Sequence, residues 1–160
     1  MIDIKIRKGI EADLAQALGL VKELSVYERA PNEVEVTLEE MKNWGFGKDK
    51  IFDFFLAEHE NKIVGIALYY YKYSTWKGKC LFLEDIIVTE TYRRYGLGSK
   101  LFNEVALVAK QQMVRRMEWQ VLEWNETALN FYKKYDSHFD KEWVNCKLSY
   151  QQLQSFSLSK

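Results

Sequence analysis

The segment from Cys80 to Gln112 reads CLFLEDIIVTETYRRYGLGSKLFNEVALVAKQQ and predicts, in order, a strand, a glycine loop and a helix. Residues 80–88 are apolar except for two acids, and residues 98–112 repeat apolar positions with the spacing of one helical face. Between them lies the hexapeptide Arg93-Arg94-Tyr95-Gly96-Leu97-Gly98. Glycines at a helix start let an anion approach backbone N–H groups that carry about half a positive charge. The hexapeptide is therefore predicted to bind phosphate, although a simple tight turn would explain it equally well.

The loop differs from the two commonest phosphate-binding motifs. It lacks the Gly-Lys-Ser or Gly-Lys-Thr ending of an ATP-binding loop. Its continuation Gly96-Leu97-Gly98-Ser99-Lys100-Leu101 also lacks the third glycine of a dinucleotide fingerprint. ATP and NAD are therefore disfavoured as ligands. Arg93, Arg94 and Lys100 are expected to add charge-assisted bonds to a pyrophosphate at the mouth of the loop.

The rest of the chain predicts one domain over residues 1–160, with strands and helices in the order βααβββαβαβ. Asp13 with Gln16, and Thr37 with Glu40, have the spacing of capping boxes that begin two helices. Asn125 is expected to cap the last helix. The strands on either side of the helix at 98–112 are parallel if that helix is a right-handed crossover. The expected strands cover residues 1–7, 52–58, 63–73, 80–88, 117–122 and 143–148.

Composition and charge narrow the class of function. The 160 residues are 48% hydrophobic, enough for one substantial core, and the 23 basic and 23 acidic residues leave no overall field for nucleic acid or an anionic membrane. No apolar run approaches the roughly 18 residues of a membrane span, and a cytoplasmic protein is predicted. Cys80 and Cys146 are predicted to be reduced core thiols, and His59 and His138 are isolated, so no metal site is expected.

Two separated segments carry a specific resemblance. An Arg-x-x-Gly-x-Gly segment between an apolar strand and a long helix resembles the acetyl-CoA pyrophosphate loop of the GNAT superfamily of N-acyltransferases. Residues 124–134, WNETALNFYKK, look like the second signature of that superfamily, an Asn-capped helix with a Phe-Tyr pair. Within it the chain resembles the diamine and thialysine acetyltransferases, over residues 21–28, 45–47, 74–78, 83–85 and 123–126. The segment around Ser74 resembles the thialysine branch more, because the polyamine branch places an acid there.

The resemblance implies an α/β fold, a single GNAT-like domain with a mixed, mostly antiparallel sheet, a splayed parallel strand pair and flanking helices. It also implies acetyl-CoA as cosubstrate and direct acetyl transfer to the primary amine of a small molecule, either a thialysine-like amino acid, a diamine or a polyamine. Two other functions stay open, a non-catalytic CoA-binding regulatory module and acetylation of a protein amine. Relatives commonly form homodimers that share strands near the C-terminus, and the aromatic-rich segment 139–150 is compatible with that.

Glu84 and Asp85 interrupt an otherwise apolar strand, where a carboxylate is costly unless it faces water or a partner. An amine with a pKa near 10.4 costs about 4.6 kcal/mol to deprotonate at pH 7, so the reaction needs a proton acceptor. By resemblance, Glu84 binds the amine and accepts its proton, with Asp85 as a second contact. Direct proton transfer from the amine to a carboxylate of pKa near 4.3 is unfavourable by about six pKa units, which favours transfer through a water molecule. The alternative for Glu84 is a structural carboxylate at a strand irregularity.

Tyr132 is the general acid that the same resemblance implies. A leaving thiolate has a pKa near 8.5 and a tyrosine one near 10, so protonation by Tyr132 would be uphill by only about 2 kcal/mol. Without the matching signature, a tyrosine at this spacing on an amphipathic helix would be assigned to the core. Asp136 departs from the family pattern, since many relatives place a glycine after this helix.

The resemblance also assigns residues to the two substrates. The main chain of residues 86–88 is expected to bond the pantetheine arm, and Asn125 to lie near the thioester. The acids Glu28, Glu84 and Asp85 suit a cationic amine, and Trp76 could add a cation–π contact. Glu28 could equally be a solvated charge at a helix end. The cofactor-binding residues are expected to be Ile86, Ile87, Val88, Arg93, Arg94, Tyr95, Gly96, Leu97, Gly98, Ser99, Asn125 and Ala128. The substrate-binding residues are expected to be Tyr27, Glu28, Trp76, Glu84, Asp85, Glu118, Trp119 and Gln120.

Overall fold

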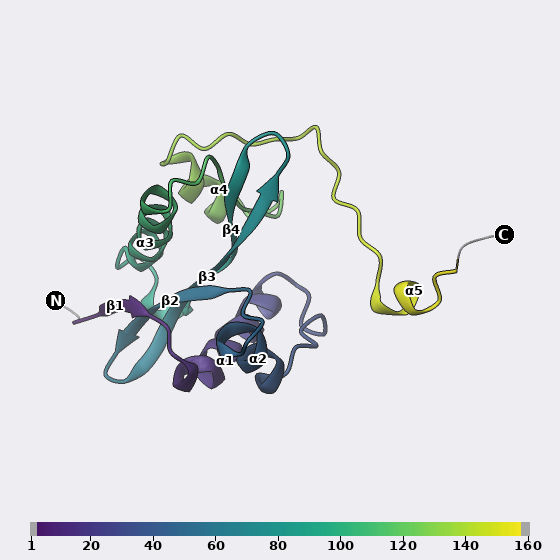
Figure 1. Cartoon of the computed structure of the whole chain (residues 1–160). Helices are drawn as coiled ribbons and strands as arrows, with labels where there is room; N and C mark the ends of the chain where they lie inside the picture. Colours follow the sequence, from purple (N-terminus) through teal and green to yellow (C-terminus); the bar gives the residue numbers. More distant parts are fainter. Residues whose placement is uncertain (1–2, 158–160) are drawn as a thin grey trace. The chain divides into compact units, whose positions relative to one another are not determined.

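The computed structural model describes residues 3–157 and divides into two compact units, Met1–Leu122 and Glu123–Lys160. The first unit is built on a five-stranded sheet with the strand order β1–β2–β3–β4–β5 (Figure 1). The elements follow the predicted order as far as α4. Their bounds are β1 Lys5–Lys8, α1 Leu14–Tyr27, α2 Leu38–Phe46, β2 Asp53–His59, β3 Lys62–Ser74, β4 Gly78–Val88, α3 Leu97–Gln111, β5 Met117–Glu118, α4 Glu126–Lys133 and α5 Tyr150–Gln154.

Two antiparallel hairpins form the centre of the sheet, of which the first, β2–β3, is the predicted one. β2 and β3 are joined by Glu60 and Asn61, whose φ angles of 50° and 64° are those of a two-residue turn that follows the twist of the strands. β3 and β4 then pair along almost their whole length, from Gly65 opposite Val88 to Ser74 opposite Gly78. The branched and aromatic side chains of these strands pack well on a pleated surface, which explains why the sequence pattern identified them.

Helices cover both faces of this sheet: α1 and α2 lie on one side and α3 on the other (Figure 1). The side chain of Ile66 packs with α1, whereas a Cβ on the preceding Gly65 would lie 3.1 Å from Leu101 of α3. Neighbouring strand residues point to opposite faces, so β3 contributes to two cores. The core beneath α1 and α2 comprises Leu14, Ala17, Leu20, Met41, Phe54, Leu56, Ile63, Ile66, Leu68 and Ile87.

β4 and β5 form the one parallel pair of the described sheet, and they separate early. Their register consists of Leu81 opposite Met117 and Phe82 opposite Glu118, although β4 continues to Val88. The predicted strand 117–122 is therefore paired only over its first two residues. The mixed sheet with a splayed parallel pair is confirmed, and it leaves one edge of β4 open beyond Phe82.

The predicted strand over residues 143–148 is wrong. That segment is irregular and exposed, with Trp143 72% and Val144 85% accessible, and it joins none of the strands of the described sheet. A strand needs a neighbour for its ladder hydrogen bonds, whatever its side-chain preference. The chain instead forms α5, which begins with a capping box in which Ser149 accepts from the Gln152 N–H and Gln152 accepts from the Ser149 N–H.

One of the predicted helix caps is also wrong. Asp13 does not cap α1: its carboxylate binds Arg7 at 2.6 Å and accepts the Ile10 N–H at 2.9 Å, while Gln16 accepts the Ile63 N–H at 2.9 Å. A charged partner outcompetes a local backbone donor. The capping box of Thr37 and Glu40 is confirmed, and so is the Asn125 cap, which accepts the Ala128 N–H at 3.1 Å.

Cys80 is a buried free thiol, as expected, but Cys146 is exposed because its predicted strand does not form. Within residues 3–157, no three His, Cys, Asp or Glu side chains are arranged so that they could hold a metal ion. Over the same described span, no helix is both long and apolar enough to cross a membrane.

Candidate functional site

An irregularity in β4 shapes the acidic part of the candidate site. Leu68 of β3 lies opposite Asp85 and the next residue, Tyr69, lies opposite Leu83, so Glu84 is an extra residue in β4. A bulge of this kind bends the strand and re-aims its side chains. Asp85 shares the α1 face of the sheet with Leu68, and Glu84 is exposed beside it. The bulge explains how two consecutive acids can both belong to one site.

Glu28, which follows α1 directly, completes an acidic cluster of Glu28, Glu84 and Asp85. Burial and, to a lesser extent, the negative charges of Glu84 and Glu28 together raise the pKa of Asp85 to about 6. Burial also raises the pKa of Glu28. Three residues predicted to bind the acceptor are therefore close enough to influence one another, although they come from two elements far apart in sequence.

This cluster makes the stability of the fold pH-dependent. Because the folded-state pKa of Asp85 is raised from 3.8 to about 6, its stabilising effect is complete below pH 3.8 and is lost as the pH rises through 6. Replacing Asp85 by Asn, which stays neutral, should raise the free energy of unfolding by about 2 kcal/mol at pH 8 and change it little at pH 4. Urea unfolding at the two pH values measures this; an equal effect at both would contradict it.

Tyr70 is a site residue that the sequence reasoning missed. It lies on β3 opposite Phe82, and its side chain hydrogen-bonds Glu84. Burial raises the pKa of Tyr70, and the negative charge of Glu84 adds to that increase. The phenol therefore stays protonated and donates to the carboxylate. Only the strand register could have revealed this contact, because nothing in the local sequence pairs Tyr70 with Glu84.

The glycine loop has the backbone of an anion site. Gly96 is the N-cap of α3 with φ 74°, Arg94 has φ 69°, and no side chain within residues 3–157 caps the helix. The first intrahelical bond runs from the Lys100 N–H to the Gly96 carbonyl at 3.1 Å, so the preceding N–H groups of the first turn have no intrahelical acceptor. Arg94, Tyr95 and Lys100 are exposed around this helix end, which fits a pyrophosphate.

The Arg93 side chain is directed elsewhere. Its Nε donates to the Val88 carbonyl at 2.9 Å, and its guanidinium lies over the ring of Tyr27, 4.9 Å from the ring centre. Arg94 and Lys100 are therefore the loop cations whose charge is exposed to an incoming anion.

The open edge of β4 offers main-chain groups beside the loop. The Thr89 N–H donates to the Val64 carbonyl at 2.9 Å, and Ile87 lies opposite Ile66, so both face β3. Alternation along the strand turns the main chain of Ile86 and Val88 to the other edge. Of the three residues expected to bond a pantetheine arm, Ile86 and Val88 therefore turn their main chain away from β3, with the Val88 carbonyl already bonded by Arg93 Nε, and Ile87 is part of the sheet and core.

The remaining predicted acceptor residues lie away from the acidic cluster or are engaged in other contacts. Trp76 is 76% exposed in the turn between β3 and β4. Glu118 is held by Lys72 at 3.2 Å and Arg116 at 3.3 Å, so its charge is already compensated. The ring of Trp119 packs edge-on against Phe102 with 5.3 Å between ring centres. Gln120 is exposed on the segment after β5.

The second unit holds the predicted thioester-side residues. Asn125 and Tyr132 are both buried, and the ring of Tyr132 packs edge-on against Phe131. The Ser137 hydroxyl donates to the Tyr132 carbonyl at 2.8 Å. Asp136 has φ 51°, a left-handed backbone conformation that a glycine would adopt without steric cost. Aspartate tolerates this left-handed conformation better than most residues.

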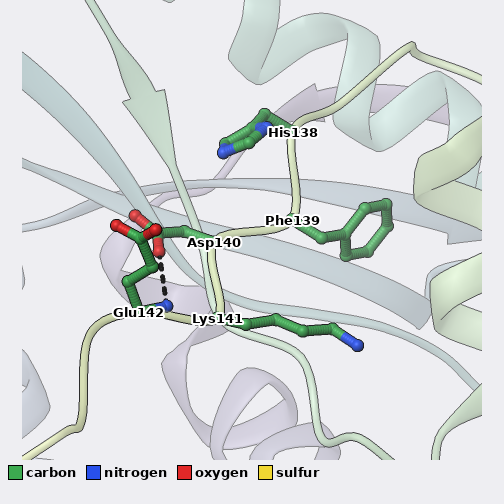
Figure 2. Close-up of a pocket in the computed structure, with 5 residues that line it drawn as sticks. All are labelled: His138, Phe139, Asp140, Lys141 and Glu142. Atoms are coloured by element: carbon green, nitrogen blue, oxygen red, sulfur yellow. Dashed lines mark hydrogen bonds between the residues drawn. The ribbon is translucent and has the colours of Figure 1, made fainter.

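Two surface hollows lie outside the acidic cluster. One, of about 510 Å³, is lined by Lys50, Ile51, Tyr70 and Tyr71 and so shares Tyr70 with the site. The other, of about 330 Å³, is formed by the consecutive residues 138–142 (Figure 2). There the Glu142 N–H donates to the Asp140 carboxylate at 2.9 Å. Because only consecutive residues of one irregular segment line this hollow, we interpret it as a bend of the chain and not as a binding site.

Comparison with known proteins identifies the family of this chain. The sequence model of the acetyltransferase (GNAT) family matches residues 18–136, and the chain belongs to that family. It is an N-acetyltransferase, and acetyl-CoA is the cosubstrate of such enzymes.

Among its relatives, thialysine N-epsilon-acetyltransferase of Bos taurus is 36% identical over 141 residues, covering 83% of each chain. L-ornithine N5-acetyltransferase NATA1 of Arabidopsis thaliana is 34% identical and covers 78% of this chain and 52% of its own. An aminoglycoside acetyltransferase from an uncultured soil sample shares the fold, with a TM-score of 0.77 at 22% identity, over 93% of this chain and 99% of its own.

Proposed function

We propose that this enzyme transfers an acetyl group from acetyl-CoA to the primary amine of a small cationic molecule, by direct attack of the amine on the thioester. The acidic cluster of Glu28, Glu84 and Asp85 supports this most directly. Gathering three carboxylates against an apolar core costs free energy that a bound ammonium group would recover. A thialysine-like amino acid, a diamine and a polyamine all carry such a group.

The glycine loop would hold the cosubstrate. Acetyl-CoA supplies an acetyl group activated as a thioester. The uncapped start of α3 would bind its pyrophosphate together with Arg94 and Lys100, and the open edge at Ile86 and Val88 would bond its pantetheine arm. Tyr95, Leu97, Gly98 and Ser99 would contribute main-chain or flanking contacts as parts of the same turn.

The acidic cluster would bind the ammonium group and take its proton. The pKa of Asp85, about 6, is only about four units below that of the amine, whereas the pKa of an ordinary glutamate is about six units below it. Glu84, oriented by the Tyr70 hydroxyl, would receive the proton through an ordered water. Asp85, with a pKa of about 6, is mainly ionised at pH 7, so it serves binding before it serves proton transfer.

Tyr132 would protonate the departing thiolate. Replacing Tyr132 by Phe should lower kcat about 10- to 30-fold, since the acid supplies a step worth about 2 kcal/mol. The affinity for acetyl-CoA should stay within twofold, because the ring and its packing on Phe131 are kept. Steady-state rates with calorimetry on the same sample measure both. An unchanged kcat would remove Tyr132 as the acid.

The choice among amines is tested by thiol release from acetyl-CoA with thialysine, ornithine, diamines and polyamines. We expect thialysine-like amino acids to be the best acceptors, because Ser74-Thr75-Trp76 lacks the acid of the polyamine branch and curated relatives named for thialysine match 83% of the chain. Acetyl-CoA binding without release for any amine would favour a regulatory module. Release only with protein or peptide amines would favour a protein acetyltransferase.

We further propose a single catalytic domain over residues 1–160 that works as a cytoplasmic homodimer. The exposed apolar side chains of Trp143, Val144 and Leu148 support the dimer, because apolar side chains at the surface can be buried against a second copy. Light scattering on the full chain gives its mass, and a monomer at micromolar concentration would rule the dimer out.

A further inference from the structure

Two contacts tie the end of α1 to the segment between β4 and α3. The Arg93 guanidinium lies over the Tyr27 ring at 4.9 Å, and the Thr89 hydroxyl donates to the Glu23 carboxylate at 3.0 Å. Tyr27 is the last residue of α1 and Glu28 is its cap, while residues 89–96 lead directly into the glycine loop. The proposed acceptor side and the proposed cosubstrate side are thus joined by side chains.

Arg93 is held firmly in this position. Its backbone N–H donates to the Glu90 carbonyl at 3.1 Å and its Nε donates to the Val88 carbonyl at 2.9 Å. The guanidinium is therefore fixed from the loop side before it meets the Tyr27 ring. Arginine suits this task because its planar cation can stack on a ring and donate from Nε at once, which lysine cannot do.

Tyr27 in turn fixes the position of Glu28. The Glu28 N–H donates to the Leu24 carbonyl at 2.8 Å, so Glu28 still follows the last turn of α1 and moves with Tyr27. A shift of the glycine loop that carried Arg93 with it would act on the ring of Tyr27 and through it on the acidic cluster.

We infer that Arg93 is a positioning residue, which sets Tyr27 and Glu28 relative to the glycine loop and thereby couples acceptor binding to cosubstrate binding, rather than a phosphate ligand. The inference rests on the proposed function. Binding linkage is reciprocal, so acetyl-CoA should strengthen amine binding by the same factor by which the amine strengthens acetyl-CoA binding. Arg94 and Lys100 remain the phosphate-binding cations.

The test compares Arg93→Gln with Arg94→Gln, neighbouring charge-removing changes of equal size. Arg93→Gln should raise the amine KM about 5- to 10-fold while the Kd for CoA alone changes less than twofold. Arg94→Gln should raise the Kd for CoA about 5-fold and leave the amine KM nearly unchanged. Calorimetry with CoA and rates with thialysine provide the two readouts, and urea unfolding verifies that each variant is folded.

A double-mutant cycle isolates the contact itself. Tyr27→Leu should raise the amine KM, and adding Arg93→Gln to it should raise KM no further, because the contact is already lost. Tyr27→Phe retains the aromatic ring, so adding Arg93→Gln to Tyr27→Phe should still raise the amine KM. If Arg93→Gln fails to fold, Arg93→Lys takes its place, with the same expected rise in KM since the fixed Nε donor is lost.

The inference is overturned if Arg93→Gln weakens CoA binding as much as Arg94→Gln does, or if the effects of Arg93→Gln and Tyr27→Leu simply add. Those outcomes require a wild-type enzyme that transfers acetyl groups. A wild-type chain that acetylates none of the amines tested would instead overturn the proposed function, and the CoA affinities of the two variants would still tell whether Arg93 is a phosphate ligand.

Discussion

Replacing Glu84 by Gln is expected to lower kcat/KM for the amine about 100- to 1,000-fold at pH 7. The amide keeps the size of the side chain and its contact with Tyr70, but it can neither accept a proton nor attract an ammonium group. The deficit should shrink as the pH approaches 10, because a growing share of the amine is then already neutral. Rates of thiol release between pH 6 and pH 10 measure both effects.

Glu60→Gln is the matched control for this substitution. Glu60 has an 84% exposed side chain in the turn between β2 and β3, outside the acidic cluster, so its replacement should leave the rate unchanged. A Glu84→Gln enzyme with normal kcat/KM throughout the pH range would contradict the role of Glu84 and would favour a structural carboxylate. A deficit that stays constant up to pH 10 would show that Glu84 acts through neither the proton nor the charge of the amine.

Replacing Gly96 by Val is expected to raise the Kd for acetyl-CoA about 100-fold. Gly96 has φ 74°, a conformation that costs a β-branched residue at least about 1–2 kcal/mol, and relaxing that strain moves the first N–H groups of α3. A valine side chain would also stand where the anion must approach. Isothermal calorimetry with acetyl-CoA measures the change.

Gly78→Val separates this local effect from a general loss of stability. Gly78 has φ 76° and, like Gly96, has nothing within 4 Å of an added Cβ, but it lies at the start of β4 in the distal turn. Both variants should lose similar stability, and only Gly96→Val should lose affinity for acetyl-CoA. Equal losses of affinity would show that strain alone is responsible, and no loss in either would exclude the loop as the cosubstrate site.

Local patterns in the sequence predicted most of the fold. The β2–β3–β4 hairpins, the glycine loop with α3, and the Asn125 cap all depend on residues close together in the chain. The predictions that failed concern segments whose structure depends on residues far away in the sequence. Asp13 binds Arg7 rather than its own helix, and residues 143–148 lack a described neighbour to pair with. A strand-like composition cannot reveal whether a partner strand is present.

The candidate site likewise has residues that the sequence identified and contacts that only the folded chain reveals. The sequence pointed to Glu28, Glu84 and Asp85, and the structure brings them together. It also pointed to Glu118 and Arg93, whose side chains are engaged by other partners that only the folded chain supplies. Tyr70 was missed because its contact with Glu84 depends on a strand bulge, and no short-range pattern predicts the register of two strands at one residue.

The bulged strand β4 has a consequence for how the length of this chain can change. In the proposed reaction its acids at positions 84 and 85 would face one substrate and its edge at Ile86 and Val88 the other, so a single strand with about 3.3 Å per residue would set the spacing between the two reacting groups. Inserting or deleting one residue there would turn every following side chain to the opposite face. Insertions and deletions should therefore be tolerated in the distal turn at residues 75–77, and the stretch from the acids to the glycine loop should keep a constant length.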